Sequence, residues 1–135
     1  MQKTLKGVKV LDMTMAISGP IATRILSDFG AEVVLVEPTG GSSIRTIGEH
    51  TMGLKCYGKK SVGCNLKTEE GKEIIKKLVE WADVFVSNYR AAGLERLGMS
   101  YEDLKAINPK LIYATITGFG NKGPNAGDMG FDVVC

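Results

Sequence analysis

Short apolar segments rich in β-branched residues alternate with amphipathic helical segments along the chain, and this alternation restricts the fold more than any other feature. Parallel strands need a long crossover between them, usually a helix, and nearly all such crossovers are right-handed. The pattern therefore predicts an α/β fold with a Rossmann-like, doubly wound and mainly parallel sheet. The candidate strands are residues 8–11, 31–36, 61–66, 84–86 and 111–117.

Capping signals mark where the intervening helices begin and end. The Gly19-Pro20 pair predicts a helix with proline at its first position, and Gly30 stands where a left-handed cap would end it. Thr68 is the expected N-cap of a second helix, and Ser100 begins a capping box for a third. The apolar residues at helical spacing are Ile21, Ile25, Leu26 and Phe29 in the first helix and Ile74, Ile75, Leu78 and Val79 in the second.

The composition is that of a folded soluble domain. Of the 135 residues, 44% are hydrophobic and 24% are charged, which argues against a disordered chain. The formal net charge of +2 is too small to indicate a nucleic-acid partner, and no apolar run reaches the roughly 18 residues of a membrane helix. One histidine and three cysteines without a CxxC pair argue against a metal site and predict free thiols in the cytoplasm.

Ligands of open α/β sheets bind beyond the carboxyl ends of the strands, where the strand order reverses. Those ends are residues 12–18, 37–40, 88–90 and 118–132. Neither a G-x-G-x-x-G fingerprint nor a Walker loop is present, which disfavours the common modes of NAD and ATP binding. The start of the Pro20 helix could attract an anion, or the Gly-Pro pair could simply begin a helix.

Basic side chains gather in the middle of the chain. No acidic residue lies between Glu49 and Glu69, and such a stretch could neutralise phosphate groups, although solvated surface lysines are the more common explanation. Asp12 ends the first strand without neighbouring acids, which favours a cap or turn role over a nucleophile. The basic residues are Lys55, Lys59, Lys60 and Lys67, followed downstream by Arg90 and Arg96.

Taken in order, these segments resemble family III CoA-transferases, the family of formyl-CoA, crotonobetainyl-CoA and 2-hydroxyacyl-CoA transferases and α-methylacyl-CoA racemases. The resemblance covers essentially the whole chain at the expected spacing, and it implies a Rossmann-like large domain that binds coenzyme A. The matching segments are residues 5–12, 18–20, 29–33, 36–38, 65–72, 82–90, 94–98, 107–113, 117–120 and 130–132.

The resemblance also implies which positions form a CoA pocket at the strand ends. It expects two residues after the first strand to line the pocket, a segment after the third strand to lie near adenine, and three residues after the fourth to border the nucleotide. It further expects Arg96 to contact phosphate and the last loop to approach the thioester, with no metal involved. In chain order the expected residues are Ile17, Ser18, Cys64, Asn65, Lys67, Asn88, Tyr89, Arg90, Arg96, Met129, Phe131 and Asp132.

Family members move CoA between an acyl-CoA thioester and a carboxylic acid through an aspartyl acyl-enzyme, and the resemblance places that aspartate beyond residue 135. The last residues form a fresh apolar run, whereas a domain ordinarily ends in a polar, loosely held segment. We therefore expect residues 1–135 to be the N-terminal part of the CoA-binding large domain, without the small domain and the C-terminal return segment. Alone it should be inactive and should associate, because full-length relatives form an interlocked homodimer, or it should depend on a complementing C-terminal chain.

Two positions depart from the family pattern. Pro38 stands where some relatives have a CoA-contacting arginine, which weakens phosphate binding there. Ile17 stands where formyl-CoA transferase-like members have glutamine, which argues for a bulky or apolar acid over oxalate.

Two other functions stay open at this point. A racemase fragment is disfavoured because that branch tends to have histidine immediately before the Asp132 position, where this chain has Phe131. A non-catalytic nucleotide-binding or interaction module is the other alternative, and titration with CoA would distinguish it.

Overall fold

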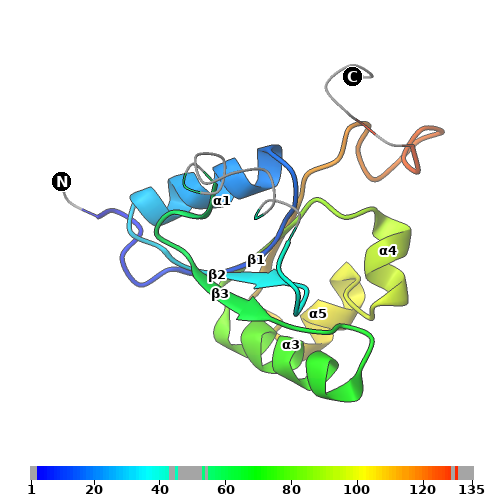
Figure 1. The fold of residues 1–135 in the computed structure, drawn as a ribbon. Helices are drawn as coiled ribbons and strands as arrows, with labels where there is room; N and C mark the ends of the chain where they lie inside the picture. The colour runs from blue at the N-terminus through cyan, green and yellow to red at the C-terminus, as the bar shows by residue number, and fades with distance from the viewer. Residues whose placement is uncertain (1–2, 43–44, 46–52, 54, 129, 131–135) are drawn as a thin grey trace.

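The computed structural model describes residues 3–42, 45, 53, 55–128 and 130 of the chain. A central sheet lies between helices that cover its two faces (Figure 1). The strands are β1 (Lys9–Met13), β2 (Glu32–Glu37), β3 (Lys60–Gly63), β4 (Val84–Ser87) and β5 (Ile112–Thr115), and the helices are α1 (Ser18–Asp28), α3 (Glu69–Trp81), α4 (Ala91–Arg96) and α5 (Tyr101–Ile107).

The five strands form one sheet in the order β3-β2-β1-β4-β5, and every neighbouring pair is parallel. From β1 the chain moves outward to β2 and β3, then returns to the other side of β1 for β4 and β5. The strand order therefore reverses between β1 and β4, where Met13 pairs with Ser87 at the carboxyl ends. This topology confirms the predicted doubly wound, parallel α/β fold.

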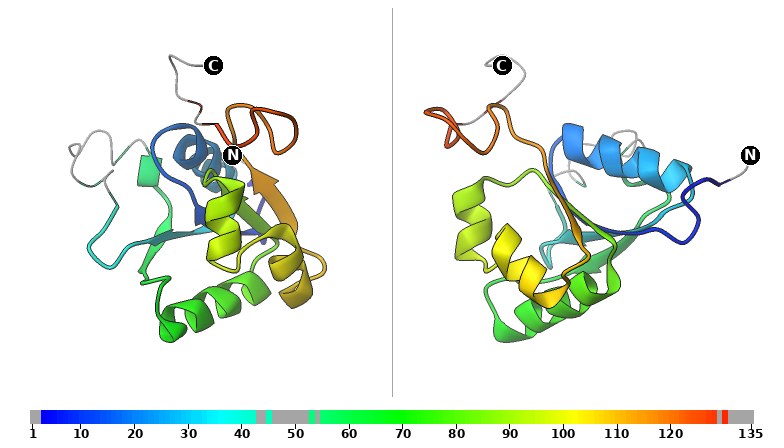
Figure 2. Two further views of the ribbon diagram at one scale, coloured as in Figure 1. Left: turned by 90° about the vertical axis from the view of Figure 1, so that its right-hand side faces the viewer. Right: turned by 180° about the vertical axis from the view of Figure 1, so that it is seen from behind.

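The two faces of the sheet are packed differently. On the face covered by α3, α4 and α5, Leu11, Met13 and Phe85 belong to a large apolar cluster that includes Val79 and Leu104. On the face covered by α1 the buried cluster is smaller and consists of Val10, Ala31, Val33 and Val86. Figure 2 shows α1 on one side of the sheet and α3, α4 and α5 on the other. Strand residues point alternately to the two faces, so the side chains of Val10 and Asp12 lie toward α1.

Several local signals behave as the sequence predicts. The Thr68 hydroxyl accepts a hydrogen bond from the Gly71 amide at the start of α3. Ser100 and Asp103 form a reciprocal capping box at the start of α5, and Gly30 has a φ of 102° directly after α1. These caps depend on groups within a few residues of each other, which is why the sequence alone identifies them.

The predictions for α1 need two corrections. The helix begins at Ser18, so Pro20 is its third residue; proline remains compatible there because the first-turn amides have no partner within the helix. Of its predicted apolar face only Leu26 packs on the core, while Ile21, Ile25 and Phe29 are 40%, 48% and 53% exposed. The helix instead contacts the sheet through Gly19, Pro20 and Thr23, which are its buried residues.

The remaining differences are small. The strand predicted over residues 61–66 is β3, which ends at Gly63, and the strand predicted over 111–117 spans four residues as β5. Much of the loop predicted over 38–60, including His50, lies outside the described residues. Within the part that is described, no helix is long and apolar enough to cross a membrane.

Replacing Gly71 in α3 should destabilise the protein. A Cβ atom at this position would lie 1.9 Å from the carbonyl oxygen of Asn65, which is backbone and cannot rotate away. We expect Gly71→Ala to lower the free energy of unfolding by about 1–3 kcal/mol, measured by urea denaturation. Gly93→Ala in α4 is the matched control, because nothing lies within 4 Å of its Cβ position, and it should stabilise the helix by about 0.5–1 kcal/mol. Similar losses in both variants would contradict the close contact at Gly71.

Candidate functional site

The carboxyl ends of the strands meet at one end of the molecule, where the chain after β5 also lies near α4 and the first turn of α1 (Figure 1). At this end a side-chain amide bridges the two strands between which the order reverses. The Met15 amide donates to Oδ1 of Asn88 at 2.9 Å, and Nδ2 of Asn88 donates to the Met15 carbonyl at 2.7 Å. The β1–α1 loop is thereby attached to the end of β4.

Below this loop lies a buried ion pair. Nζ of Lys59 is 2.8 Å from Oδ2 of Asp12, and their side chains are 1% and 0% exposed. Lys59 also donates to the Pro20 carbonyl at 2.9 Å, and the Thr23 hydroxyl lies 2.6 Å from Oδ2 of Asp12. The other carboxylate oxygen accepts from the amide and the hydroxyl of Thr14. Asp12 therefore has the structural role that its position predicted, and together with Lys59 it holds the first two turns of α1 against the end of β1.

A second buried carboxylate lies at the end of β2. Glu37 accepts a bidentate pair of hydrogen bonds from Arg45, one from the Ser61 hydroxyl and one from the Ser42 amide. Hydrogen bonding to Arg45 is the largest cause that lowers the pKa of Glu37 from 4.5 to about 2. The carboxylate is therefore ionised and fully engaged with its own chain, which makes it a structural group at neutral pH.

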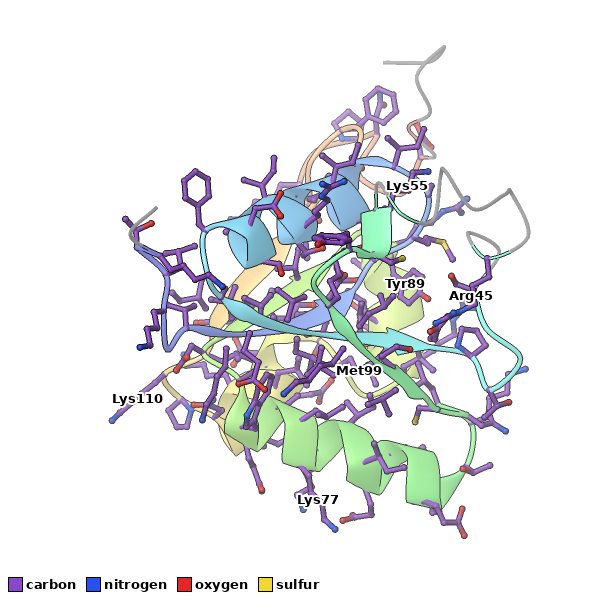
Figure 3. All side chains as sticks on the ribbon, turned by 60° about the vertical axis from the view of Figure 1, so that its left-hand side comes forward. Arg45, Lys55, Lys77, Tyr89, Met99 and Lys110 are labelled. Atoms are coloured by element: carbon purple, nitrogen blue, oxygen red, sulfur yellow. The ribbon has the colours of Figure 1, made fainter. Side chains whose placement is uncertain are left out.

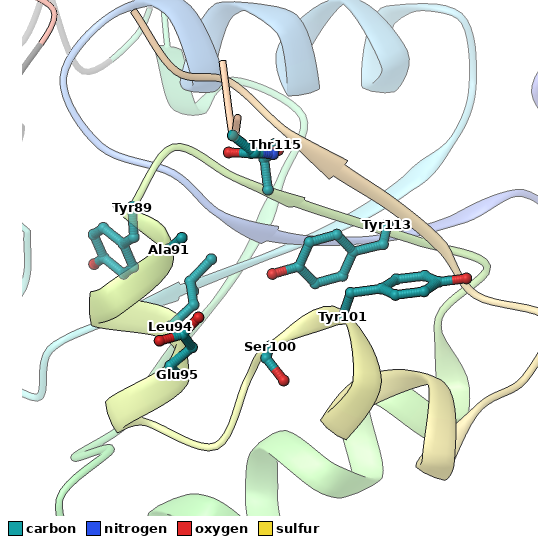
Figure 4. Close-up of a pocket in the computed structure, with 9 residues that line it drawn as sticks. Tyr89, Ala91, Leu94, Glu95, Ser100, Tyr101, Tyr113 and Thr115 are labelled. Carbon is teal, nitrogen blue, oxygen red and sulfur yellow. The ribbon is translucent and has the colours of Figure 1, made fainter. Parts of the chain in front are cut away.

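Two hollows open near the strand ends. One lies between α4, α5 and β5 and is lined by Tyr89, Leu94, Tyr101 and Tyr113 among others (Figure 4). The other is lined by Glu37, Pro38, Thr39, Gly40, Gly41, Arg45 and Gly63, at the ends of β2 and β3. In the first hollow, burial raises the pKa of the Tyr89 and Tyr113 hydroxyls, which keeps both of them protonated donors at neutral pH.

The structure places the predicted site residues at this end with differing access to solvent. Ile17 and Ser18 are exposed at the start of α1, and Lys67, Arg90 and Arg96 are exposed at or near the ends of β3 and β4. Nε of Arg96 donates to the Ala92 carbonyl in its own helix, which leaves its terminal nitrogens for other partners. Whether any of these residues contacts CoA stays a prediction.

Three predicted residues have their polar groups directed to the protein itself. The Cys64 thiol is buried and lies 3.3 Å from the Gly71 carbonyl, and burial raises its pKa, so it is a neutral packing group. Asn65 Oδ1 accepts from the Lys67 amide within the same turn. Asn88 holds Met15 as described. The expected residues Met129, Phe131 and Asp132 lie outside the described residues.

The basic stretch divides into buried and exposed lysines. Lys59 is buried and donates to Asp12, Thr23 and the Pro20 carbonyl, so it is not part of an exposed phosphate-binding patch. Lys60 pairs with Glu32, but both side chains of that pair are exposed, and a role of Lys60 toward phosphate stays a prediction. Lys67 has no ion pair with the described residues. Figure 3 shows Arg45 and Tyr89 at the carboxyl ends, with Lys77 on the outer side of α3 and Lys110 toward the opposite end.

The sequence does not predict two structural features of this end of the sheet. One is the ion pair of Glu37 with Arg45, for which the only signal is an acidic residue at the end of an otherwise apolar strand. Lys59 could not be distinguished from its exposed neighbours in the sequence, since only the fold brings Asp12 to it. Among the described residues, no cluster of histidine, cysteine and acidic side chains could hold a metal ion.

Comparison with known proteins identifies the family. The family model described as "CoA-transferase family III" matches residues 5–135. The chain belongs to CoA-transferase family III. It is 43% identical to human succinyl-CoA:glutarate CoA-transferase over 98% of its own length and 32% of that protein. It is 40% identical to (R)-2-hydroxy-4-methylpentanoate CoA-transferase of Clostridioides difficile, over 95% of this chain and 35% of that one.

Solved structures show the same fold. A crystal structure of a CAIB/BAIF family protein from Brucella suis superposes with a TM-score of 0.93 at 38% identity, covering 98% of this chain and 38% of that one. The chain therefore spans about a third of the length of the relatives that it matches.

Removing the charge of Lys59 should be much more damaging than removing that of its neighbour. Lys59→Met leaves Asp12 buried without its cation, and we expect a loss of about 3–5 kcal/mol in the free energy of unfolding. Lys60→Met breaks an exposed pair with Glu32 and should cost less than about 1 kcal/mol. Thermal or urea denaturation of both variants measures the difference, and equal losses would show that the buried pair has no special role.

The state of Glu37 should be visible in the pH dependence of stability. Because its pKa falls from 4.5 to about 2 on folding, its contribution is fully present above pH 4.5 and is lost as the pH falls toward 2. We expect Glu37→Gln to remove about 1–2 kcal/mol at pH 7, since the half-exposed Arg45 is partly screened by solvent. The stability gap between variant and wild type should close below pH 4.5. Glu70→Gln, which changes an exposed carboxylate of α3, is the control. A difference in stability between Glu37→Gln and wild type that stays unchanged at low pH would contradict the lowered pKa of Glu37.

Proposed function

We propose that this chain forms the CoA-binding part of a CoA-transferase, which moves CoA between an acyl-CoA thioester and a carboxylic acid. The match of residues 5–135 to CoA-transferase family III is the observation that carries the proposal. Relatives at about 40% identity are named for this reaction with succinyl-CoA and glutarate and with a 2-hydroxy acid. The chain spans only about a third of them, so the activity belongs to the whole protein.

The arrangement of charge at the strand ends supports binding of a phosphate-rich ligand. CoA has a pyrophosphate and a 3′-phosphate, which arginine and lysine bind through charge-assisted hydrogen bonds. Lys67, Arg90 and Arg96 are exposed at or near this end, and α1 has no acidic residue in its first turn and no side-chain cap. Its first amides are therefore open to an anion, in keeping with the positive end of the helix dipole.

In the proposed reaction, an aspartate beyond residue 135 is the nucleophile. Its carboxylate attacks the thioester carbonyl, and the CoA thiolate leaves to give a mixed anhydride. The thiolate then attacks the aspartyl carbonyl and releases the first carboxylic acid, which leaves CoA on the enzyme as a thioester. Splitting the transfer in this way replaces one difficult step with easier ones. Residues 1–135 bind and orient CoA through these steps and supply no catalytic carboxylate.

Ile17 favours an acceptor with apolar bulk. It is 51% exposed at the start of α1, where an aliphatic side chain offers no hydrogen bond to a small dicarboxylate. We therefore propose a bulky or apolar carboxylic acid as the acyl acceptor. The whole enzyme is proposed to be a cytoplasmic, interlocked homodimer, and no metal takes part.

Calorimetric titration with CoA tests the binding role. We expect micromolar binding to the wild type, and Lys67→Ala or Arg96→Ala should weaken it about tenfold, because a charge-assisted hydrogen bond contributes about 1.5–3 kcal/mol. Lys77→Ala removes an exposed lysine from the outer side of α3 and should leave the affinity unchanged. Pantetheine, which lacks the nucleotide phosphates, should show no difference among the variants. Absence of CoA binding by the wild type would overturn the proposal.

The same protein should associate and should be catalytically silent. Ile21, Ile25 and Phe29 expose apolar surface along α1, and such surface favours association. Size-exclusion chromatography with light scattering should find a species larger than a monomer. Isotope exchange between acyl-CoA donors and carboxylic acids should show no turnover. A stable monomer would contradict the first expectation, and turnover by this chain alone would contradict the second.

A further inference from the structure

The loop between β1 and α1 has a conformation that its own sequence does not favour. Ala16 has a φ of 62°, and it is the non-glycine residue with positive φ among those described. An L-residue in the left-handed region costs roughly 1–2 kcal/mol, so the surroundings must supply the energy that keeps Ala16 there. Ile17, at the next position, has φ −121° and ψ −64°, and α1 begins at Ser18.

Both ends of this loop are held by the buried ion pair. Thr14 is fixed by its two hydrogen bonds to Asp12, and Pro20 is fixed by the bond from Lys59 to its carbonyl. The middle of the loop, which includes Ala16, has no such connection to Asp12 or Lys59. It is hydrogen-bonded to the residue that directly follows β4.

Asn88 supplies that connection. Its amide exchanges two hydrogen bonds with the backbone of Met15, at 2.9 and 2.7 Å. The backbone ladder between β1 and β4 ends with Met13 opposite Ser87, so the Asn88 side chain continues the pairing one step beyond the strands. The Asn88 side-chain amide therefore uses one donor and its acceptor oxygen on Met15, the residue immediately before Ala16.

We propose that Asn88 is a positioning residue: it holds Met15 so that Ala16 stays left-handed and Ile17, Ser18 and the first amides of α1 face the ligand. This inference rests on the proposed CoA-binding function and assigns Asn88 a role through the loop in place of the direct nucleotide contact expected from the sequence. Asn88 lies where the strand order reverses, after β4, and Met15 follows β1. A single side chain therefore links the two halves of the sheet and holds the turn that we propose faces the ligand.

The test is a double-mutant cycle between Asn88 and Ala16. Asn88→Ala should weaken CoA binding about tenfold. Glycine adopts positive φ without a penalty, so in an Ala16→Gly background the same change should weaken binding only about two- to threefold. If Asn88 acted only by contacting CoA directly, its loss would not act through the conformation of residue 16, so binding would weaken by the same factor in both backgrounds. Equal losses would therefore overturn the positioning role.

Hydrogen exchange without ligand makes the test independent of CoA. The Met15 amide donates to Asn88, and Asn88→Ala should speed its exchange at least tenfold. Asn108→Ala is the matched control, because that asparagine also bridges segments, through the Val79 and Ala82 carbonyls, but lies just before β5 at the opposite end of the sheet. It should lower overall stability without selectively exposing Met15.

The outcomes separate the two proposals. Unchanged protection of Met15 in Asn88→Ala would overturn the positioning role whatever the affinity for CoA. Faster exchange at Met15 in a protein that binds no CoA would overturn the proposed ligand and leave the control of the loop by Asn88 in place.

Discussion

The buried ion pair between Asp12 and Lys59 is the interaction on which the arrangement at the carboxyl ends of the strands depends. Both side chains are almost completely buried, and a charge left alone in such a place costs several kcal/mol. Neither group can therefore leave without the other. Asp12 belongs to β1, Lys59 precedes β3 and both contact Thr23 of α1. The pair therefore keeps three separate segments in one arrangement.

This polar centre explains why the two sides of the sheet differ. The side facing α3 and α5 has a large apolar core, whereas the side facing α1 has a small one beside the ion pair. The α1 helix approaches the strands through small residues; a Cβ atom on Gly19 would lie 2.4 Å from that of Thr14. Because the inner face of the helix makes these close contacts and hydrogen bonds, its larger apolar residues lie on the solvent side. The same contact leaves the first-turn amides at the end where Lys67 and Arg96 are exposed.

Much of the fold could be predicted because its signals are local or periodic. Strand position, the Thr68 cap and the Ser100 capping box depend on neighbouring residues, and the alternation of strands and helices implies the parallel topology. The apolar spacing of α1 was also real, but periodicity shows only which residues share a face. It does not say which face turns inward, and in α1 the deciding factors were Gly19 and Thr23, which the hydrophobic pattern ignores.

The sequence predicts where the candidate site lies but not the role of each of its residues. From the sequence, Lys59, Lys60 and Lys67 are equivalent members of one basic stretch. The fold gives the first a buried aspartate and the second an exposed glutamate, and only the third stays unpaired among the described residues. Asn88 similarly has the chemistry of a ligand contact until the structure shows Met15 within reach of both ends of its amide.

The sequence by itself determined the class of fold and the family, because these follow from patterns along the chain, and it predicted the end of the sheet where we propose that CoA binds. Only the tertiary structure decided which charged and polar side chains face each other there. Those partners are separated by 47 residues for Lys59 and Asp12 and by 73 for Asn88 and Met15. Hydrogen bonds and ion pairs act over a few ångströms, so their existence depends on which distant segments the completed sheet brings together.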